Sequence, residues 1–235
     1  MKLYKRIYTA LALLLIAGVL GSCIGMNADI TIRRNGSGFL VMEYRMSREL
    51  ESLGKLDGNV RWPPIPTGKA DFERTADRVP GLTLKSFSSK SGKKDIINRV
   101  KLEFDDTGAL LGFLDSLGQG AALVRENGQN RLTLTFGNYG QGNEFPENLF
   151  SGNSLPSING DLAELAAAAC EGYALEMSFT LPGSAELFLT DRDGVKIENP
   201  AGWKTQSGTR AAFSAPIGDM LLSAEPARLE IRWAL

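Results

Sequence analysis

Apolar and polar residues alternate with a period of two along several stretches of this chain. The apolar members of the four clearest stretches are Val100, Leu102 and Phe104; Leu132, Leu134 and Phe136; Leu175, Met177, Phe179 and Leu181; and Leu229, Ile231 and Trp233. Strands with this pattern turn one side to a core and the other side to water. Short turns rich in Gly, Asn, Asp and Lys, typical of antiparallel hairpins, lie at residues 34–38, 89–94, 126–130 and 191–194. The pattern predicts a mainly antiparallel sheet.

Segments with helical periodicity interrupt the hairpins. Residues 106–118 place leucines and Phe113 at helical spacing, with Thr107 as a candidate N-cap. Residues 159–172 repeat the pattern, and shorter helices are expected at residues 47–55 and 69–79. The apolar face of each helix must pack against another part of the fold, and the sheet provides a suitable surface. We therefore predict an α+β fold with helices packed on one face of the sheet; a membrane-touching helix is the alternative for the first segment.

A long segment without helical or strand periodicity is a possible domain boundary. Residues 137–160 are rich in Gly, Asn and Pro, and a loop of this length is usually functional or mobile. No decisive linker is present elsewhere. We expect a single domain over residues 23–235; the alternative places a boundary in this loop, with residues 161–235 as a small second unit.

The N-terminus has the features of a bacterial export signal. Lys2, Lys5 and Arg6 precede an uncharged apolar run at residues 7–20, which matches the charged head and apolar body of such a signal. A helix needs roughly 20 residues to cross a hydrocarbon core ~30 Å thick, and this run is shorter. The segment is therefore predicted to be a signal rather than a permanent span.

The signal ends in "LGSC", where two small residues, Gly21 and Ser22, precede Cys23. This motif resembles the lipobox of bacterial lipoproteins, in which the cysteine thiol is alkylated with diacylglycerol. A peptidase then cuts before the cysteine, here between Ser22 and Cys23, and the new amino terminus is usually acylated, for instance with palmitate. The resemblance implies removal of residues 1–22 and a lipid anchor on Cys23 that holds the domain on the extracytoplasmic side of the cell membrane or outer membrane. An ordinary secretory signal with an incidental cysteine is the alternative.

Composition narrows the chemistry of the chain. It has 26 Lys+Arg against 27 Asp+Glu and no basic tract, which argues against a nucleic-acid partner. It has no histidine, which excludes Ser-His-Asp and Cys-His catalysis and the commonest zinc sites. We expect no metal and no cofactor. Cys170 is expected to be a buried small hydrophobe without a disulfide partner, because Cys23 is committed to lipid.

Short motifs give no catalytic site. The densest basic patch, "KSGKK" at residues 90–94, is expected to be a solvated hairpin turn. Two S-x-x-K matches, at residues 52–55 and 91–94, lack the companion motifs of a serine acyl-transfer enzyme. "DRDG" at residues 191–194 lacks the bidentate glutamate of a calcium loop. We therefore predict no catalytic residue and a non-enzymatic protein; a hydrolase that uses a serine or carboxylates is the less favoured alternative.

Three longer stretches resemble the LppM-type domain of bacterial envelope lipoproteins. They are the opening "ADITIRRNGSGFLVMEYRMS", the central "NRVKLEFDDTGALLGFLDSLG", and the closing segment that contains "FTLPG" at residues 179–183 and "LSA" at residues 222–224. The resemblance implies an α+β domain with a strongly curved antiparallel sheet and helices against its concave side. It also implies envelope glycolipid binding, and it transfers no catalytic residue. Some relatives carry a second, C-terminal anchor, whereas this chain ends in "RLEIRWAL" without an apolar run.

These features predict a membrane-tethered, non-enzymatic binding domain for an envelope lipid or glycolipid. Residues on alternate strand positions and on the first long helix, Phe113, Leu175, Met177 and Phe179, are the candidate ligand lining. A protein-interaction or scaffold lipoprotein is the alternative. The expected partners are the membrane, through the N-terminal anchor, and an envelope lipid or glycolipid.

Overall fold

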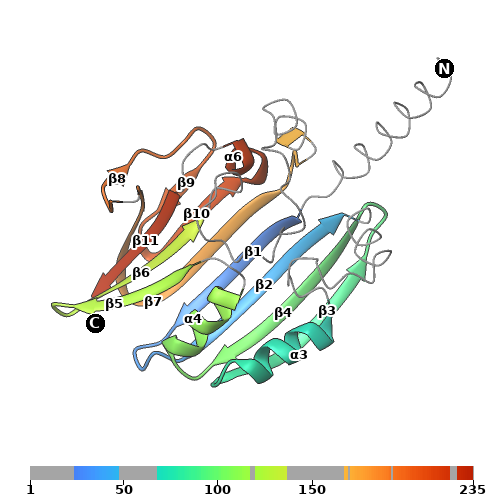
Figure 1. Ribbon diagram of the computed structural model, residues 1–235, viewed down its shortest axis with the longest axis horizontal. Helices are drawn as coiled ribbons and strands as arrows, with labels where there is room; N and C mark the ends of the chain where they lie inside the picture. The colour runs from blue at the N-terminus through green and yellow to red at the C-terminus, as the bar shows by residue number, and fades with distance from the viewer. Residues whose placement is uncertain are drawn as a thin grey trace, which may run out of the picture.

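The computed structural model describes residues 24–47, 68–116, 120–136, 167–168, 170–191, 193–222 and 227–234. Its strands form one sheet of 11 strands (Figure 1). The strands are β1 (Ile24–Ile32), β2 (Gly38–Ser47), β3 (Leu82–Ser91), β4 (Asp95–Phe104), β5 (Ala121–Glu126), β6 (Gln129–Phe136), β7 (Ala174–Thr190), β8 (Lys196–Ile197), β9 (Lys204–Gln206), β10 (Gly208–Pro216) and β11 (Ala227–Ala234). Three helices accompany the sheet in the described residues: α3 (Lys69–Arg78), α4 (Thr107–Ser116) and α6 (Ile217–Leu222).

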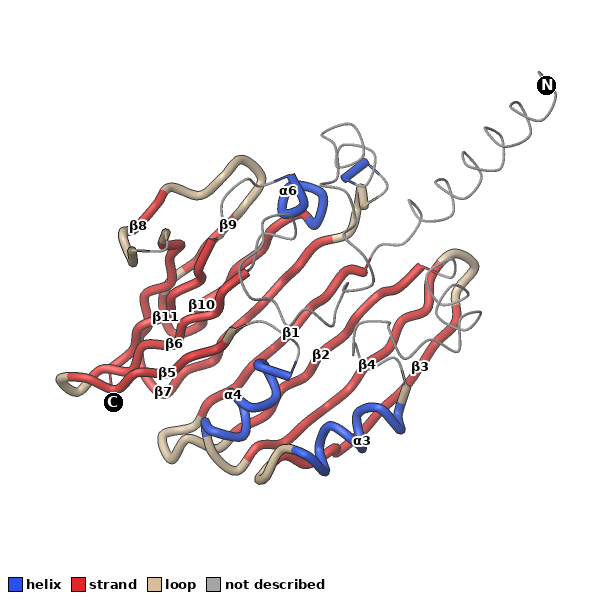
Figure 2. The backbone as a smooth tube through the Cα atoms, in the orientation of Figure 1, coloured by secondary structure: helices blue, strands red, loops and turns tan. Residues whose placement is uncertain are grey.

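The sheet is mainly antiparallel and strongly curled. Its main path runs β3-β4-β2-β1-β7-β11-β6-β5, with β8 and β10 paired to β7 and β9 paired to β10. The β1–β7 pair is parallel, and the other strand pairs within the described residues are antiparallel. We call β3, β4, β2 and β1 the first wing of the sheet and β11, β6 and β5 the second wing. Figure 2 shows the two wings meeting at β7 and curling toward one side. The predicted α+β class and the curved, mainly antiparallel sheet are thus confirmed.

The long strand β7 joins the two wings. Its first part pairs with β1 on one side and with β10 on the other, and residues 185–190 pair with β11. The pairing register with β10 shifts between Gly208 and Arg210. A register irregularity of this kind bends a strand and increases its twist. The sheet therefore turns within β7, which brings β11, β6 and β5 round to face the first wing.

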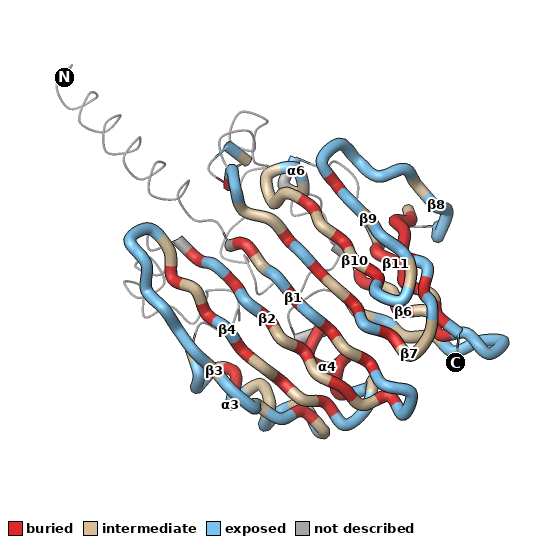
Figure 3. Tube along the Cα trace, turned by 180° about the vertical axis from the view of Figure 1, so that it is seen from behind, coloured by how far each residue is buried: buried red, intermediate tan, exposed pale blue. Residues whose placement is uncertain are grey.

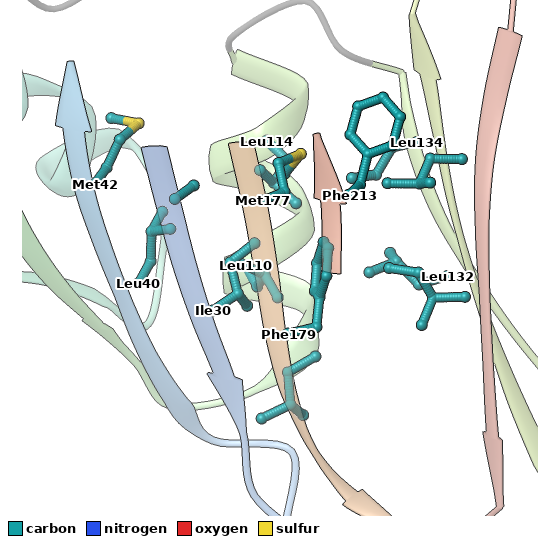
Figure 4. Packing of buried hydrophobic residues seen from close by; sticks show 14 of the residues in the cluster. Ile30, Leu40, Met42, Leu110, Leu114, Leu132, Leu134, Met177, Phe179 and Phe213 are labelled. Carbon is teal, nitrogen blue, oxygen red and sulfur yellow. The ribbon is translucent and has the colours of Figure 1, made fainter. Parts of the chain in front are cut away.

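The predicted alternation is present in the described side chains of β2, β4 and β6 and in the first half of β7 (Figure 3). In β4, Val100, Leu102 and Phe104 are fully buried, whereas Lys101 and Glu103 between them are partly exposed. The buried faces meet in one hydrophobic cluster between the wings, to which α4 and β6 also contribute (Figure 4). Burial of this apolar surface, at about 25 cal/mol per Å², is the main stabilising term of such a fold.

The second half of β7 and β11 depart from the simple pattern, because they bury residues on both faces. Phe188, Thr190 and Glu230 are all buried although they lie on the outward side. The cationic groups of Lys196 and Arg232 lie over the Phe188 ring, at 5.1 and 4.8 Å from its centroid. Their long side chains cover the outer surface of this wing, which explains why a polar position such as Glu230 is out of water.

Two of the predicted helices are present, and one predicted cap is wrong. Helix α3 buries Phe72, and α4 buries Leu110, Phe113 and Leu114 in the common core. The cap of α4 is Asp106 rather than Thr107: its Oδ1 accepts a hydrogen bond from the Ala109 N–H at 2.9 Å. Thr107 is already the first helical residue, so its side chain cannot occupy the flanking cap position.

Several sequence predictions lie outside the described residues. These are the helix at residues 47–55, the loop at residues 137–160 and most of the helix at residues 159–172. The packing of all helices on one face therefore stays a prediction, since α6 continues from the end of β10 rather than crossing a face. The single-domain assignment also stays a prediction. No helix within the described part of the chain is long and apolar enough to cross a membrane.

Candidate functional site

The four candidate lining residues are core residues. Phe113 of α4 and Leu175, Met177 and Phe179 of β7 have exposed fractions of 0, 5, 1 and 0 %. All four belong to the one hydrophobic cluster, and Figure 4 shows Met177 and Phe179 pointing toward the same interior as Leu114 of α4. The structure thus brings the predicted residues together. Their contact with a ligand stays a prediction.

The second candidate region is the end of the sheet at which β1 begins. Along the strand register, Ile24 is opposite Met46, Met46 is opposite Ile96, and Ile96 is opposite Ser91. The start of β1 therefore lies in one row with the hairpin that connects β3 and β4 (Figure 1). We call this end of the strands the near end. The turn before β7 and the start of α6 also lie there. The opposite end of the strands, which includes the β1–β2 hairpin at residues 33–37, is the far end.

A polar cluster braces the near end. The Tyr173 hydroxyl donates a hydrogen bond to Asp95 Oδ1 at 2.7 Å, and Arg45 Nε lies 3.4 Å from Asp95 Oδ2. Arg45 also donates from Nη2 to the Gly172 carbonyl oxygen at 3.2 Å, and its guanidinium lies 4.7 Å from the centroid of the Tyr173 ring. These contacts tie the turn before β7 to the ends of β2 and β4. They also pair the Arg45 and Asp95 charges with each other.

The lysine hairpin beside this cluster is a solvated turn, as predicted. Its backbone is closed by a hydrogen bond from the Gly92 N–H to the Asp95 carbonyl oxygen at 2.7 Å. Lys90, Lys93 and Lys94 are exposed, and none of them forms an ion pair with another described residue. The hairpin therefore presents three positive charges at the near end that no described carboxylate neutralises.

Cys170 lies in the turn that precedes β7 and differs from its prediction. It is buried, as expected, with an exposed fraction of 5 %. However, it is disulfide-bonded, so the prediction that it lacks a disulfide partner is wrong in this structure. The sequence has 2 cysteines, and Cys23 lies outside the described residues. The prediction relied on Cys23 being committed to lipid.

The sequence did not point to a buried polar group beneath α3. Tyr44 of β2 and Asn98 of β4 are directly opposite each other on the inner face, with exposed fractions of 3 and 1 %. Burial raises the pKa of Tyr44 above its ordinary range, with a hydrogen bond to Asn98 opposing the rise and the nearby Asp71 charge adding to it. Tyr44 is therefore a neutral phenol at physiological pH. The one signal in the sequence was Asn98 at an inward position between Ile96 and Val100.

The acidic side chains of the described residues can be compared with the needs of a metal site and of a calcium loop. The part of the chain that the structure describes contains no group of three or more Asp, Glu, His or Cys side chains suited to a metal ion. The "DRDG" segment forms the predicted turn: Asp191 Oδ1 accepts hydrogen bonds from the N–H groups of Asp193 and Val195, both at 2.9 Å. This Asx-type arrangement uses the carboxylate to hold the turn itself.

Comparisons with known proteins give a structural likeness but no match in sequence. No protein-family model matches the chain, and no curated protein matches it. Among solved structures, the chain is similar to the folded domain of the Mycobacterium tuberculosis LppM protein determined by NMR, with a TM-score of 0.41 and 10% identity over 90% of this chain and 91% of that chain. This structural neighbour is of the kind named by the sequence resemblance. A likeness of this degree carries no argument about function.

Proposed function

We propose that this protein is an envelope lipoprotein, anchored through lipid on Cys23, whose curled sheet is a non-enzymatic binding domain. The observation that carries the proposal is the position of the first strand. β1 begins at Ile24, the residue that follows the lipobox cysteine in the sequence. Cleavage between Ser22 and Cys23 would therefore leave every described strand intact and would join the anchor to the folded sheet without a linker.

The proposed ligand is an apolar or amphipathic envelope lipid or glycolipid. The interior between the two wings is filled by buried apolar side chains, including Met177 and Phe179 on β7 and Leu132 and Leu134 on β6. Sites for small apolar ligands are lined mostly by such residues. A partner protein that binds the outer surface is the alternative, and it requires no access to this interior.

The disulfide at Cys170 favours a second candidate, an exported domain without a lipid anchor. In that form, Cys23 would stay a free thiol in the precursor and would be available for a disulfide. In the lipoprotein form, Cys23 carries a thioether and Cys170 is a buried thiol. The two forms have the same sheet but different covalent chemistry at one atom, so they are directly distinguishable.

The test is the intact mass of the protein recovered in detergent from its own membranes, measured before and after reduction. A lipoprotein is expected to begin at Cys23, to carry acyl mass and to be unchanged by the reductant. An unacylated chain that gains the mass of two hydrogens on reduction would overturn the anchor. The control is Cys170→Ser, which should keep its acyl mass, whereas Cys23→Ser should lose it.

The ligand is tested on the same preparation. Organic extraction followed by mass spectrometry should release a lipid that binds non-covalently. Met177→Trp adds bulk to the interior and should lower the amount of lipid released per mole of protein, whereas Thr180→Trp, on the exposed side of the same strand, should not. An acylated protein that releases no lipid would contradict the lipid-binding part of the proposal and favour the protein-interaction alternative.

A further inference from the structure

We infer that the lysine hairpin, residues 90–94, is a second membrane contact that binds anionic lipid headgroups. This inference rests on the proposed anchor at Cys23 and adds an orientation of the domain on the bilayer. The contact would be made by the side chains of Lys90, Lys93 and Lys94. The far end of the sheet would then point away from the membrane.

The strand register places the hairpin level with the anchor. Adjacent Cα atoms are 3.8 Å apart, so an anchored Cys23 keeps Ile24 close to the lipid surface. Ile24 is in one row with Ser91 through Met46 and Ile96. The turn residues 92–94 continue beyond that row. With strands about 4.8 Å apart, the hairpin lies roughly 14 Å to the side of β1 and at the same height.

A direct connection between the proposed anchor and β1, without a linker, would restrict how the domain is oriented on the bilayer. A flexible linker would let the domain tumble above the bilayer, and any face could meet the lipid. Here the anchor would be followed directly by a strand that is paired on both sides, with β2 and with β7. The near end is also braced by the Arg45, Asp95 and Tyr173 contacts. The near end must therefore face the membrane whenever Cys23 is inserted.

The charges of the hairpin suit an anionic surface. The three lysines are exposed and form no ion pair with a described residue. The neighbouring carboxylate, Asp95, is already engaged by Arg45 and Tyr173. An anionic leaflet attracts each nearby lysine by about 1 kcal/mol, a factor of about five. Because a Debye length is only about 8 Å, the attraction acts only on charges held close to the surface, as these would be.

An exposed apolar residue marks the same end. Helix α6 starts at Ile217, whose N–H donates to the Tyr173 carbonyl oxygen at 2.9 Å, so α6 lies at the near end. Leu222, at the end of this helix, is 49 % exposed. Surfaces that meet the headgroup region of a membrane combine exposed apolar side chains with basic ones. The lysines and Leu222 thus border the start of β1 on its two sides.

The inference is tested by lysine footprinting of the full, acylated protein reconstituted into vesicles. One sample uses phosphatidylcholine alone, and the other adds phosphatidylglycerol. An amine-reactive reagent then labels accessible lysines, which are counted by peptide mass spectrometry. The anionic vesicles should reduce labelling of Lys90, Lys93 and Lys94 by about fivefold, and high salt should restore it. Lys69 and Lys196, exposed residues away from the hairpin, are the internal controls.

Each outcome decides the inference. Equal labelling of the hairpin in both vesicles, from a protein shown by mass to be acylated, would overturn the membrane contact while leaving the lipoprotein proposal in place. Equal protection by inorganic phosphate without vesicles would also overturn it, because the site would then bind a soluble anion. A protein without acyl mass would remove the anchor and overturn both.

A variant keeps the test independent of labelling chemistry. Replacing Lys90, Lys93 and Lys94 with Gln should leave folding intact, because the side chains are solvent-exposed. Amide hydrogen exchange at residues 91–95 should then be the same on neutral and anionic vesicles, whereas the unaltered protein should exchange several-fold more slowly on the anionic ones. The matched control replaces Arg34, Lys69 and Lys196 with Gln and should keep that protection.

Discussion

The basic residues at the far end of the sheet and the three lysines of the near-end hairpin differ in the partners that their charges have. At the far end, Arg33 and Lys101 lie over the Phe39 ring at 4.6 and 4.5 Å from its centroid, and Lys85 lies 2.8 Å from Glu103. At the near end, the three hairpin lysines have no such partner among the described residues. The basic residues at the far end therefore help to hold the fold, whereas those of the lysine hairpin are available to a partner outside the chain.

The largest effect expected at the far end is that of Gly38→Ala. A Cβ atom at this position would lie 1.8 Å from the Thr31 carbonyl oxygen and 2.6 Å from Phe104 Cζ, so the β1–β2 hairpin would have to move. Such overpacking should lower the free energy of unfolding by about 3 kcal/mol, measured by denaturant titration.

The near-end control for this change is Gly25→Ala on the same strand pair. The nearest atom to its Cβ would be Tyr173 Cδ1, at 3.3 Å, and a ring edge can shift more easily than backbone. We expect a loss within about 1 kcal/mol. Equal losses at Gly25 and Gly38 would show that the far end is not the more tightly built of the two.

Phe39→Leu tests whether the far-end cations contribute to stability through the ring. Leucine keeps an apolar side chain but removes the π face from Arg33 and Lys101. Cation–π pairs at exposed sites contribute about 0.5–1 kcal/mol each, so the unfolding free energy should fall by about 1–2 kcal/mol. The triple Gln variant of the lysine hairpin should change it by less than about 0.5 kcal/mol. A loss from the hairpin variant as large as that from Phe39→Leu would contradict the comparison.

Tyr173→Phe tests the brace at the near end. It removes the hydroxyl that donates to Asp95 Oδ1 at 2.7 Å but keeps the ring that lies under Arg45. Loss of one hydrogen bond to a charged group should cost about 1.5 kcal/mol, reduced by the partial exposure of the site to about 1 kcal/mol. The measurement is thermal unfolding together with hydrogen exchange in the turn before β7. Unchanged exchange there would mean that the cluster does not brace this end.

The local elements could be predicted from the sequence, because their causes are local. The alternation around Leu102 gives β4, the Gly, Asn and Lys turns give the hairpins, and the spacing around Phe113 gives α4. The cap of α4 was misassigned by one residue, since Asp106 and Thr107 can both cap a helix and only the backbone geometry distinguishes them.

The assembly of the near end could not be predicted in the same way. Arg45, Asp95 and Tyr173 are far apart in sequence, and only the order β3-β4-β2-β1-β7 brings them together. That order includes the parallel β1–β7 pair, which no hairpin turn specifies. The lysine hairpin was predicted as a turn, but its alignment with Ile24 depends on pairings across three strands.

The smallest expected effect is on the pH dependence of stability that arises from the pair of Lys85 and Glu103. The hydrogen bond from Lys85 lowers the pKa of Glu103, burial opposes this, and the positive charges of Lys85, Arg33 and Lys101 lower it further. Since the folded-state pKa is below the unfolded value, this contribution is complete above the unfolded pKa and is lost as pH falls through the folded one. Lys85→Gln should therefore show a smaller decrease in Tm between about pH 5 and about pH 3 than the unaltered protein. Lys90→Gln, which removes a near-end lysine that has no ion-pair partner among the described residues, should keep the original decrease. If the two variants have the same acid profile, the Lys85–Glu103 pair does not stabilise the far end, and the contrast between the two ends reduces to Phe39 and its two cations.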